Sequence, residues 1–122
     1  MKKIAILSFA LLTSSFVFSQ KTYVPDDKFE QALIDLGYDT TLDDSVLTAN
    51  ISSVTKLELY GKEISDLTGI EDFTALVRLN CAKNQLTSLD VSSNTALIKL
   101  FCEDNLFTNL DVSKNTTLNS LT

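Results

Sequence analysis

The chain has 122 residues and carries 10 basic against 16 acidic side chains, a formal net charge of −6. An acidic surface repels phosphate backbones and anionic headgroups, which argues against nucleic-acid or membrane-surface binding. Histidine is absent, so the chain cannot form a Ser–His or Cys–His nucleophile pair and lacks a common zinc ligand. A glycine-rich phosphate loop is also missing. The numerous carboxylates leave a glycosidase-like acid pair open, but no pattern indicates a cofactor, a metal or an enzyme.

Residues 1–19 have the pattern of a signal peptide. Lys2 and Lys3 form a basic head, residues 4–12 are nearly all apolar, and small residues precede the predicted cut after Ser19. The apolar stretch is shorter than the ~20 residues of a membrane span. We therefore expect a secreted or cell-surface protein without membrane insertion after cleavage. Its mature form has 8 basic and 16 acidic residues, a net charge of −8.

Residues 20–53 are predicted to form an N-terminal helical cap. Asp27 is the predicted N-cap of a short amphipathic helix, with Glu30 three residues later as in a capping box. Gly37 closes the run as a C-cap glycine would. The apolar stripe of this helix consists of Phe29, Ala32, Leu33 and Leu36.

An acidic loop follows the predicted helix and contains Asp39, Asp43 and Asp44. These aspartates lack the alternating spacing and the glycine of a calcium loop, so we expect helix capping instead. The cap would belong to a second helical turn that carries Val46 and Leu47. The triplet Asp44-Ser45-Val46 also resembles an O-glycosylation site of some Gram-negative bacteria, although three residues are a weak motif.

From residue 54 onward the sequence repeats. Residues 76–96 align without a gap on residues 97–117, and 11 of the 21 positions are identical. Each unit has apolar residues at the first, fourth, sixth and eleventh positions, and the two units from residue 76 onward have Asn at the ninth. The units are residues 54–75, 76–96 and 97–117, and another begins at 118. A unit this short cannot bury its apolar face alone, so the units must stack.

This spacing resembles the leucine-rich repeat, L-x-x-L-x-L-x-x-N-x-L, at the short end of its period range. It is especially similar to the internalin-like short-repeat proteins that bacteria secrete, and the Val-Pro-Asp-Asp-x-Phe-Glu opening looks like their N-terminal cap. The resemblance implies an α/β solenoid, a right-handed superhelix with a parallel β-sheet on its concave face. Turns or 3₁₀ segments would line the convex face, and a short helical cap would cover the N-terminal end.

In such a coil the strand residues between the core positions point into the concavity and stack into columns. The expected columns are Lys56, Arg78 and Lys99, then Glu58, Asn80 and Phe101, then Tyr60, Ala82 and Glu103. We define the concave face as these residues without Ala82. Cations beside exposed aromatic rings are typical of a protein or glycan contact surface. The alternative is an ordinary solvated sheet face.

Asn84 and Asn105 occupy the same place in successive units, just after the strand. An Asn side chain offers a donor and an acceptor to backbone groups left open by a buried turn. The resemblance implies that these residues form a structural asparagine ladder. The first unit departs from the pattern, with Lys62 in place of Asn.

Cys81 and Cys102 also repeat, at an inward strand position. Stacking places them on neighbouring strands ~4.8 Å apart, within reach of a disulfide but awkward for its dihedral angle. Cysteine is also among the most commonly buried side chains. The sequence favours buried free thiols and leaves a disulfide open.

The functional prediction is a non-catalytic extracellular recognition module that binds a protein or glycan through its concave face. The alternatives are a structural spacer in a larger surface protein and the N-terminal part of a longer secreted enzyme. The chain stops shortly after another unit begins at residue 118. We therefore expect a fragment whose partners include further repeats or domains of the full-length chain, and whose last complete unit leaves apolar side chains partly uncovered.

Overall fold

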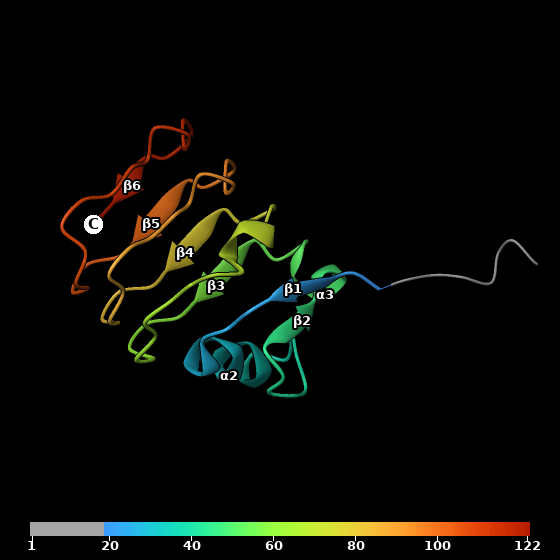
Figure 1. Ribbon diagram of the computed structural model, residues 1–122. Coiled ribbons are helices and arrows are strands. Elements are labelled where there is room, and N and C mark those ends of the chain that lie inside the picture. Colours follow the sequence, from blue (N-terminus) through green and yellow to red (C-terminus); the bar gives the residue numbers. More distant parts are fainter. Residues whose placement is uncertain (1–18) are drawn as a thin grey trace, which may run out of the picture.

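The computed structural model describes residues 19–122, so the predicted signal peptide lies outside the described residues except for Ser19. Residues 54–122 form stacked coils, and each coil contributes one short strand to a parallel sheet (Figure 1). In sheet order these strands are β3 (Lys56–Glu58), β4 (Arg78–Asn80), β5 (Lys99–Phe101) and β6 (Ser120–Leu121). The solenoid with a parallel sheet is thereby confirmed. Within the described residues, no helix has both the length and the apolar character to cross a membrane.

The sheet follows from the alternation of side chains along each strand. Leu57, Leu79 and Leu100 share one register and are fully buried, while their neighbours point outward. On the return path, the 3₁₀ helix η1 (Ile70–Asp72) is the one helical element within residues 54–122. It begins after Gly69, whose φ of 110° suits glycine. The return side thus contains turns and one 3₁₀ helix, as predicted.

Two asparagines join the turns that follow the strands. The Oδ1 atom of Asn84 accepts from the N–H groups of Lys62 and Ile64 in the preceding coil, at 3.0 Å each. Its Nδ2 group donates to carbonyls of both coils, including Leu59 at 2.7 Å. Asn105 repeats most of these bonds one coil later, where its Oδ1 accepts from the N–H of Leu86 and its Nδ2 donates to the carbonyls of Cys81 and Cys102. Although the first unit has Lys62 in place of Asn, the backbone groups of its turn are therefore bonded by Asn84 of the next coil.

A second pair of asparagines, which the sequence analysis missed, joins the return segments. Asn94 donates to the carbonyls of Ile70 and Phe73, at 2.9 and 3.1 Å. Asn115 donates to the carbonyls of Val91 and Asn94, each at 2.9 Å. Both side chains are buried. Their repetition in the Ser-x-Asn-Thr sequence of both units was the available signal.

The N-terminal cap contains strands as well as helices. Its elements are β1 (Lys21–Tyr23), α2 (Asp27–Asp35), β2 (Ser45–Leu47) and α3 (Thr48–Ile51). The predicted second helical turn through Val46 and Leu47 is wrong, because these residues pair antiparallel with β1. The pairing buries Val46 and leaves Leu47 exposed. The helix starts only at Thr48, and the aspartates of the acidic loop do not cap it.

The N-cap of α2 is Asp26 and not the predicted Asp27. Its Oδ1 accepts from the N–H groups of Lys28 and Phe29, at 2.9 and 3.1 Å. Its Oδ2 accepts from two N–H groups of the first repeat, those of Ser65 and Asp66, at 2.9 Å each. One carboxylate therefore closes the helix and ties the cap to the repeats.

The far end of α2 agrees with the prediction of a glycine C-cap. Gly37 has a φ of 89°, and its N–H donates to the carbonyl of Ile34 at 2.9 Å. The N–H of Tyr38 donates to Leu33 at the same distance. These two bonds are those of a Schellman motif, in which a left-handed residue satisfies the last carbonyls of a helix.

A single apolar core runs from the cap into the coils. Phe29 of α2 lies against Phe73 of the first return, with ring centroids 6.3 Å apart, and both are fully buried. From the sequence we expect the last complete unit to leave Leu97, Leu100, Cys102 and Phe107 only partly covered. For the first three this is wrong, because β6 and Leu118 pack over them. Among the side chains expected to be partly covered, Phe107 is half-buried.

We predict that Asp26→Ala lowers the free energy of unfolding by about 2 kcal/mol, because four backbone donors lose a charged acceptor. Asp27→Ala is the matched control, since Asp27 is exposed and not the N-cap. It should cost less than about 1 kcal/mol. Urea unfolding followed by circular dichroism measures both. Equal destabilisation by the two variants would contradict the role of Asp26.

Candidate functional site

The concave face is assembled by the sheet register. Lys56, Arg78 and Lys99 stand opposite one another on β3, β4 and β5. Glu58, Asn80 and Phe101 form the next row two residues along. Each row lies between buried core positions and points away from them. The structure therefore brings the first two predicted columns together as rows across the sheet.

The third predicted column is interrupted. Backbone hydrogen bonds extend the strand alignment to Tyr60, Ala82 and Glu103. Tyr60 and Glu103 are exposed, whereas Ala82 is 1% exposed and adds no contact surface. The carboxylate of Glu103 accepts a hydrogen bond of 2.8 Å from the hydroxyl of Thr122. Two separate side chains, instead of a continuous column, therefore remain at this edge.

Arg78 is the centre of the concave face and is held from two sides. Its Nε donates to Oε1 of Glu58 at 2.9 Å. Its guanidinium carbon lies 4.7 Å from the centroid of the Phe101 ring. Because the ion pair is partly exposed, it contributes little to stability. Its effect is to fix the orientation of a cation that would otherwise sample many rotamers.

A second contact of this kind involves Lys83, which the sequence analysis did not select. Its Nζ lies 5.7 Å from the centroid of the Tyr60 ring, and the adjacent Tyr60 hydroxyl raises the pKa of the lysine. Lys83 has a left-handed φ of 56°, like Gly61 and Asp104 at the same place in the neighbouring coils. Gly61 in the first unit indicated a turn with a positive φ at this position. The turn in the second unit brings Lys83 close to Tyr60 of the concave face.

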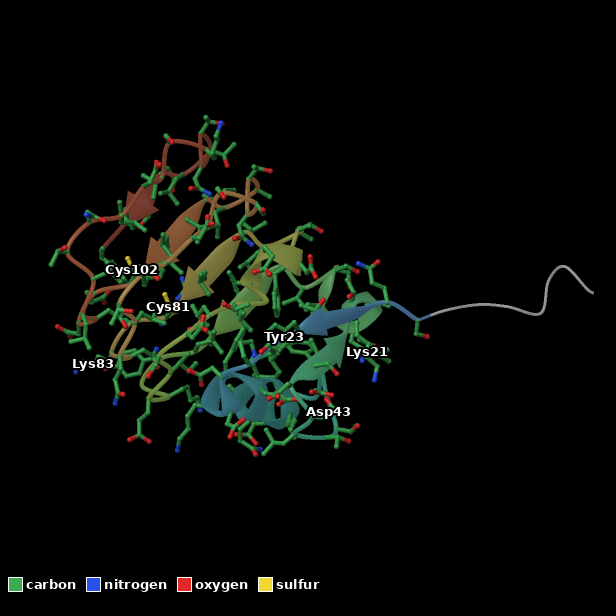
Figure 2. All side chains as sticks on the ribbon, in the orientation of Figure 1. Lys21, Tyr23, Asp43, Cys81, Lys83 and Cys102 are labelled. Atoms are coloured by element: carbon green, nitrogen blue, oxygen red, sulfur yellow. The ribbon has the colours of Figure 1, made fainter. Side chains whose placement is uncertain are left out.

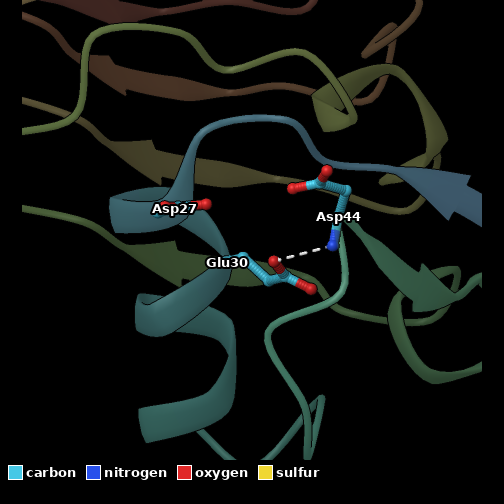
Figure 3. A group of neighbouring side chains, drawn as sticks. All are labelled: Asp27, Glu30 and Asp44. Atoms are coloured by element: carbon cyan, nitrogen blue, oxygen red, sulfur yellow. Dashed lines mark hydrogen bonds between the residues drawn. The ribbon is translucent and has the colours of Figure 1, made fainter.

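The acidic residues of the cap serve the fold of their own loop. Glu30 is fully buried, and its carboxylate accepts from the N–H groups of Asp43, Asp44 and Ser45 at 2.9, 3.0 and 3.2 Å. Figure 3 shows this carboxylate between α2 and the loop, with Asp27 on the helix nearby. Carboxylate oxygens of Asp27, Glu30 and Asp44 lie within 4.8 Å of one another. Because backbone donors already occupy both oxygens of Glu30, the arrangement is a clamp on the loop.

Cys81 and Cys102 lie side by side on successive coils (Figure 2). Both are free thiols in the structure, with exposures of 0 and 7%. Burial raises the pKa of Cys81 to about 12, and burial followed by the charge of Glu103 raises the pKa of Cys102. A buried neutral thiol packs as a small apolar side chain and is a poor nucleophile.

Comparisons with known proteins agree with this architecture, although no family model matches the chain. Internalin J of Listeria monocytogenes serotype 4b (strain F2365) is 36% identical over 72 residues, which are 59% of this chain and 8% of internalin J. The functional domain of InlJ from Listeria monocytogenes, whose structure includes a cysteine ladder, matches with a TM-score of 0.75 and 33% identity. That match covers 88% of this chain and 25% of the InlJ chain.

The internalin InlF of Listeria monocytogenes strain 4b F2365 matches with a TM-score of 0.71 and 25% identity. The match covers 81% of this chain and 30% of InlF. The chain thus spans a small part of the curated relative and less than a third of these two solved structures. Its similarity to them concerns the cap and the coils that the structure describes.

We predict that Cys81 and Cys102 resist iodoacetamide at pH 8 in the folded protein and react fully in urea. At a pKa of about 12 only about one Cys81 thiol in ten thousand is ionised at that pH, the pKa of Cys102 is also raised by burial, and burial blocks access of the reagent to both. Mass spectrometry of timed samples gives the two rates. A folded-state rate equal to the unfolded one, or a mass two units low that reductant restores, would contradict buried free thiols.

Proposed function

Because the chain is an internalin-like bacterial leucine-rich-repeat protein, we propose that it is a non-catalytic recognition module that binds an extracellular protein or glycan through its concave face. The observation that carries the proposal is the orientation of Arg78 between Glu58 and Phe101. A central Arg beside an aromatic ring is the composition of an interface hot spot. Its fixed orientation also reduces the entropy that binding would cost.

Export is part of the same proposal. The basic head, the apolar core and the small exit residues of residues 1–19 support cleavage after Ser19. The remaining net charge of −8 suits a protein that stays in solution outside the cell. The recognition surface would then face the medium or a neighbouring cell.

The two cysteines have a structural part in this proposal. The related InlJ domain includes a cysteine ladder, and Cys81 and Cys102 occupy one inward position in successive coils here. We propose that they are two steps of a similar ladder, in which thiols fill the core in place of leucine. Such a ladder supports the sheet from behind and takes no part in binding.

The proposal predicts that Arg78→Ala combined with Phe101→Ala weakens adhesion of beads coated with the chain to cells or matrix. Truncation of central aromatic and arginine contacts commonly costs about 2 kcal/mol, or roughly thirtyfold in affinity. Circular dichroism should show an unchanged fold, because both side chains are half-buried and point away from the core. Adhesion counts at matched coating density provide the measurement.

A matched control changes two exposed residues elsewhere on the coils, Asn109→Ala and Lys114→Ala. This control should adhere as the unchanged protein does. Equal adhesion by the Arg78/Phe101 double variant would remove recognition through the concave face and favour the spacer role.

A further inference from the structure

We infer that the concave face selects an acidic segment of a protein partner, with Arg78 as the anchor and Lys56 and Lys99 as flanking cations. The inference rests on the proposed function, since it names the class of partner for the same face. It is carried by the row of three cations across β3, β4 and β5 together with the fixed orientation of the middle one.

The contacts of Arg78 leave its binding edge open. In the described chain the guanidinium makes one hydrogen bond, from Nε to Glu58, while one ring face of Phe101 covers it. Arginine has five N–H donors, so the four of the two Nη groups stay available. Their planar fork matches a carboxylate bidentately. Arg78 is therefore prepared for a carboxylate before any ligand arrives.

The two lysines extend this site to both sides. Lys56 and Lys99 are exposed and stand in register with Arg78. Within residues 19–122 the ion pairs are Lys28 with Glu63 and Arg78 with Glu58, so neither flanking lysine has a carboxylate within 4.0 Å. Adjacent strands lie ~4.8 Å apart, so the row spans about 10 Å, the length of about three residues of extended chain.

The rest of the surface is mainly acidic, so an acidic partner would be attracted to this row and to few other places. The mature chain has 16 acidic and 8 basic residues, and three of the eight basic residues form the row. An acidic segment is therefore repelled by most of the surface and attracted to the concave face. Such a distribution steers the approach and fixes the orientation of a charged partner.

The aromatic residues favour a protein over a glycan. A sugar ring packs on an open aromatic face, but Phe101 has Arg78 over its ring and Tyr60 has Lys83 over its ring. Hollows of the described surface lie along the returns, at residues such as Asp66, Glu71 and Asp90, and in the cap, and one beside the cap reaches the end of the row at Lys56. An open sheet face whose aromatic rings each carry a cation over one face suits the carboxylates of an extended protein segment.

The test uses the full chain and a synthetic peptide with about four consecutive Glu residues between Gly-Ser flanks, a run that covers the ~10 Å row. A second peptide has Gln at every Glu position. Isothermal titration calorimetry should show the Glu peptide binding at least about tenfold more tightly than the Gln peptide, with affinity that falls as salt rises. Arg78→Ala should weaken binding of the Glu peptide about tenfold.

Two further variants sharpen the test. Lys56→Gln combined with Lys99→Gln removes the flanking charges at exposed positions and should also weaken binding. Lys114→Ala removes one charge away from the row and should leave binding unchanged. Equal affinity for the Glu and Gln peptides, or equal loss in Lys114→Ala and Arg78→Ala, would overturn the inference.

Heparin serves as the anionic glycan probe. Heparin binding that exceeds Glu-peptide binding and disappears in Arg78→Ala would overturn the assignment to a protein. The adhesion assay distinguishes failure of the acidic-partner inference from failure of recognition through the concave face. If the Arg78/Phe101 variant loses adhesion while the Glu peptide does not bind, recognition stands and the acidic partner is wrong. If that variant keeps its adhesion, both are wrong.

Discussion

A coil of 21 residues is too thin to enclose its own apolar side chains, and this constraint determines the rest of the structure. Leu57, Leu79 and Leu100 become buried only because each coil lies on the next. Stacking also buries the turns, whose backbone groups then need partners. The asparagine side chains supply them, with Asn84 and Asn105 after the strands and with a second pair on the return path. Apolar burial and polar satisfaction thus depend on the same register.

The register also produces the candidate site. Equivalent positions meet on adjacent strands, so a basic residue kept at one outward position becomes a row across the sheet, as with Lys56, Arg78 and Lys99. The neighbouring row is not uniform, and its differences matter more. Glu58 lies on one side of Arg78 and Phe101 on the other. The repeated position supplies the three cations, and the varied position supplies Glu58 and Phe101, which fix the orientation of the Arg78 side chain.

The coils could be predicted from the sequence because the spacing that determines them is short and recurs in every unit. Core positions, rows and strand order all follow from one spacing. The cap was harder, because its decisive contacts join residues far apart in the chain. The pairing of β1 with β2 and the bonds from Asp26 to Ser65 have no local pattern. Glu30 resembled a capping-box residue, yet its carboxylate is buried and holds the loop before β2. The rows could be predicted, whereas the brace on Arg78 and the approach of Lys83 depend on rotamers that spacing does not specify.

The core and the proposed recognition surface lie on opposite faces of the same strands. The inward residues and the asparagines carry the stability, since they are buried and bonded between coils. Lys56 and Lys99 are exposed and form no ion pair within the described chain. Exposed lysines of this kind contribute little to stability. A row of three like charges at strand spacing instead carries a small repulsive cost, because like charges opposite one another destabilise a sheet. The fold does not depend on this row, which is consistent with the proposed role of its cations in attracting an acidic partner.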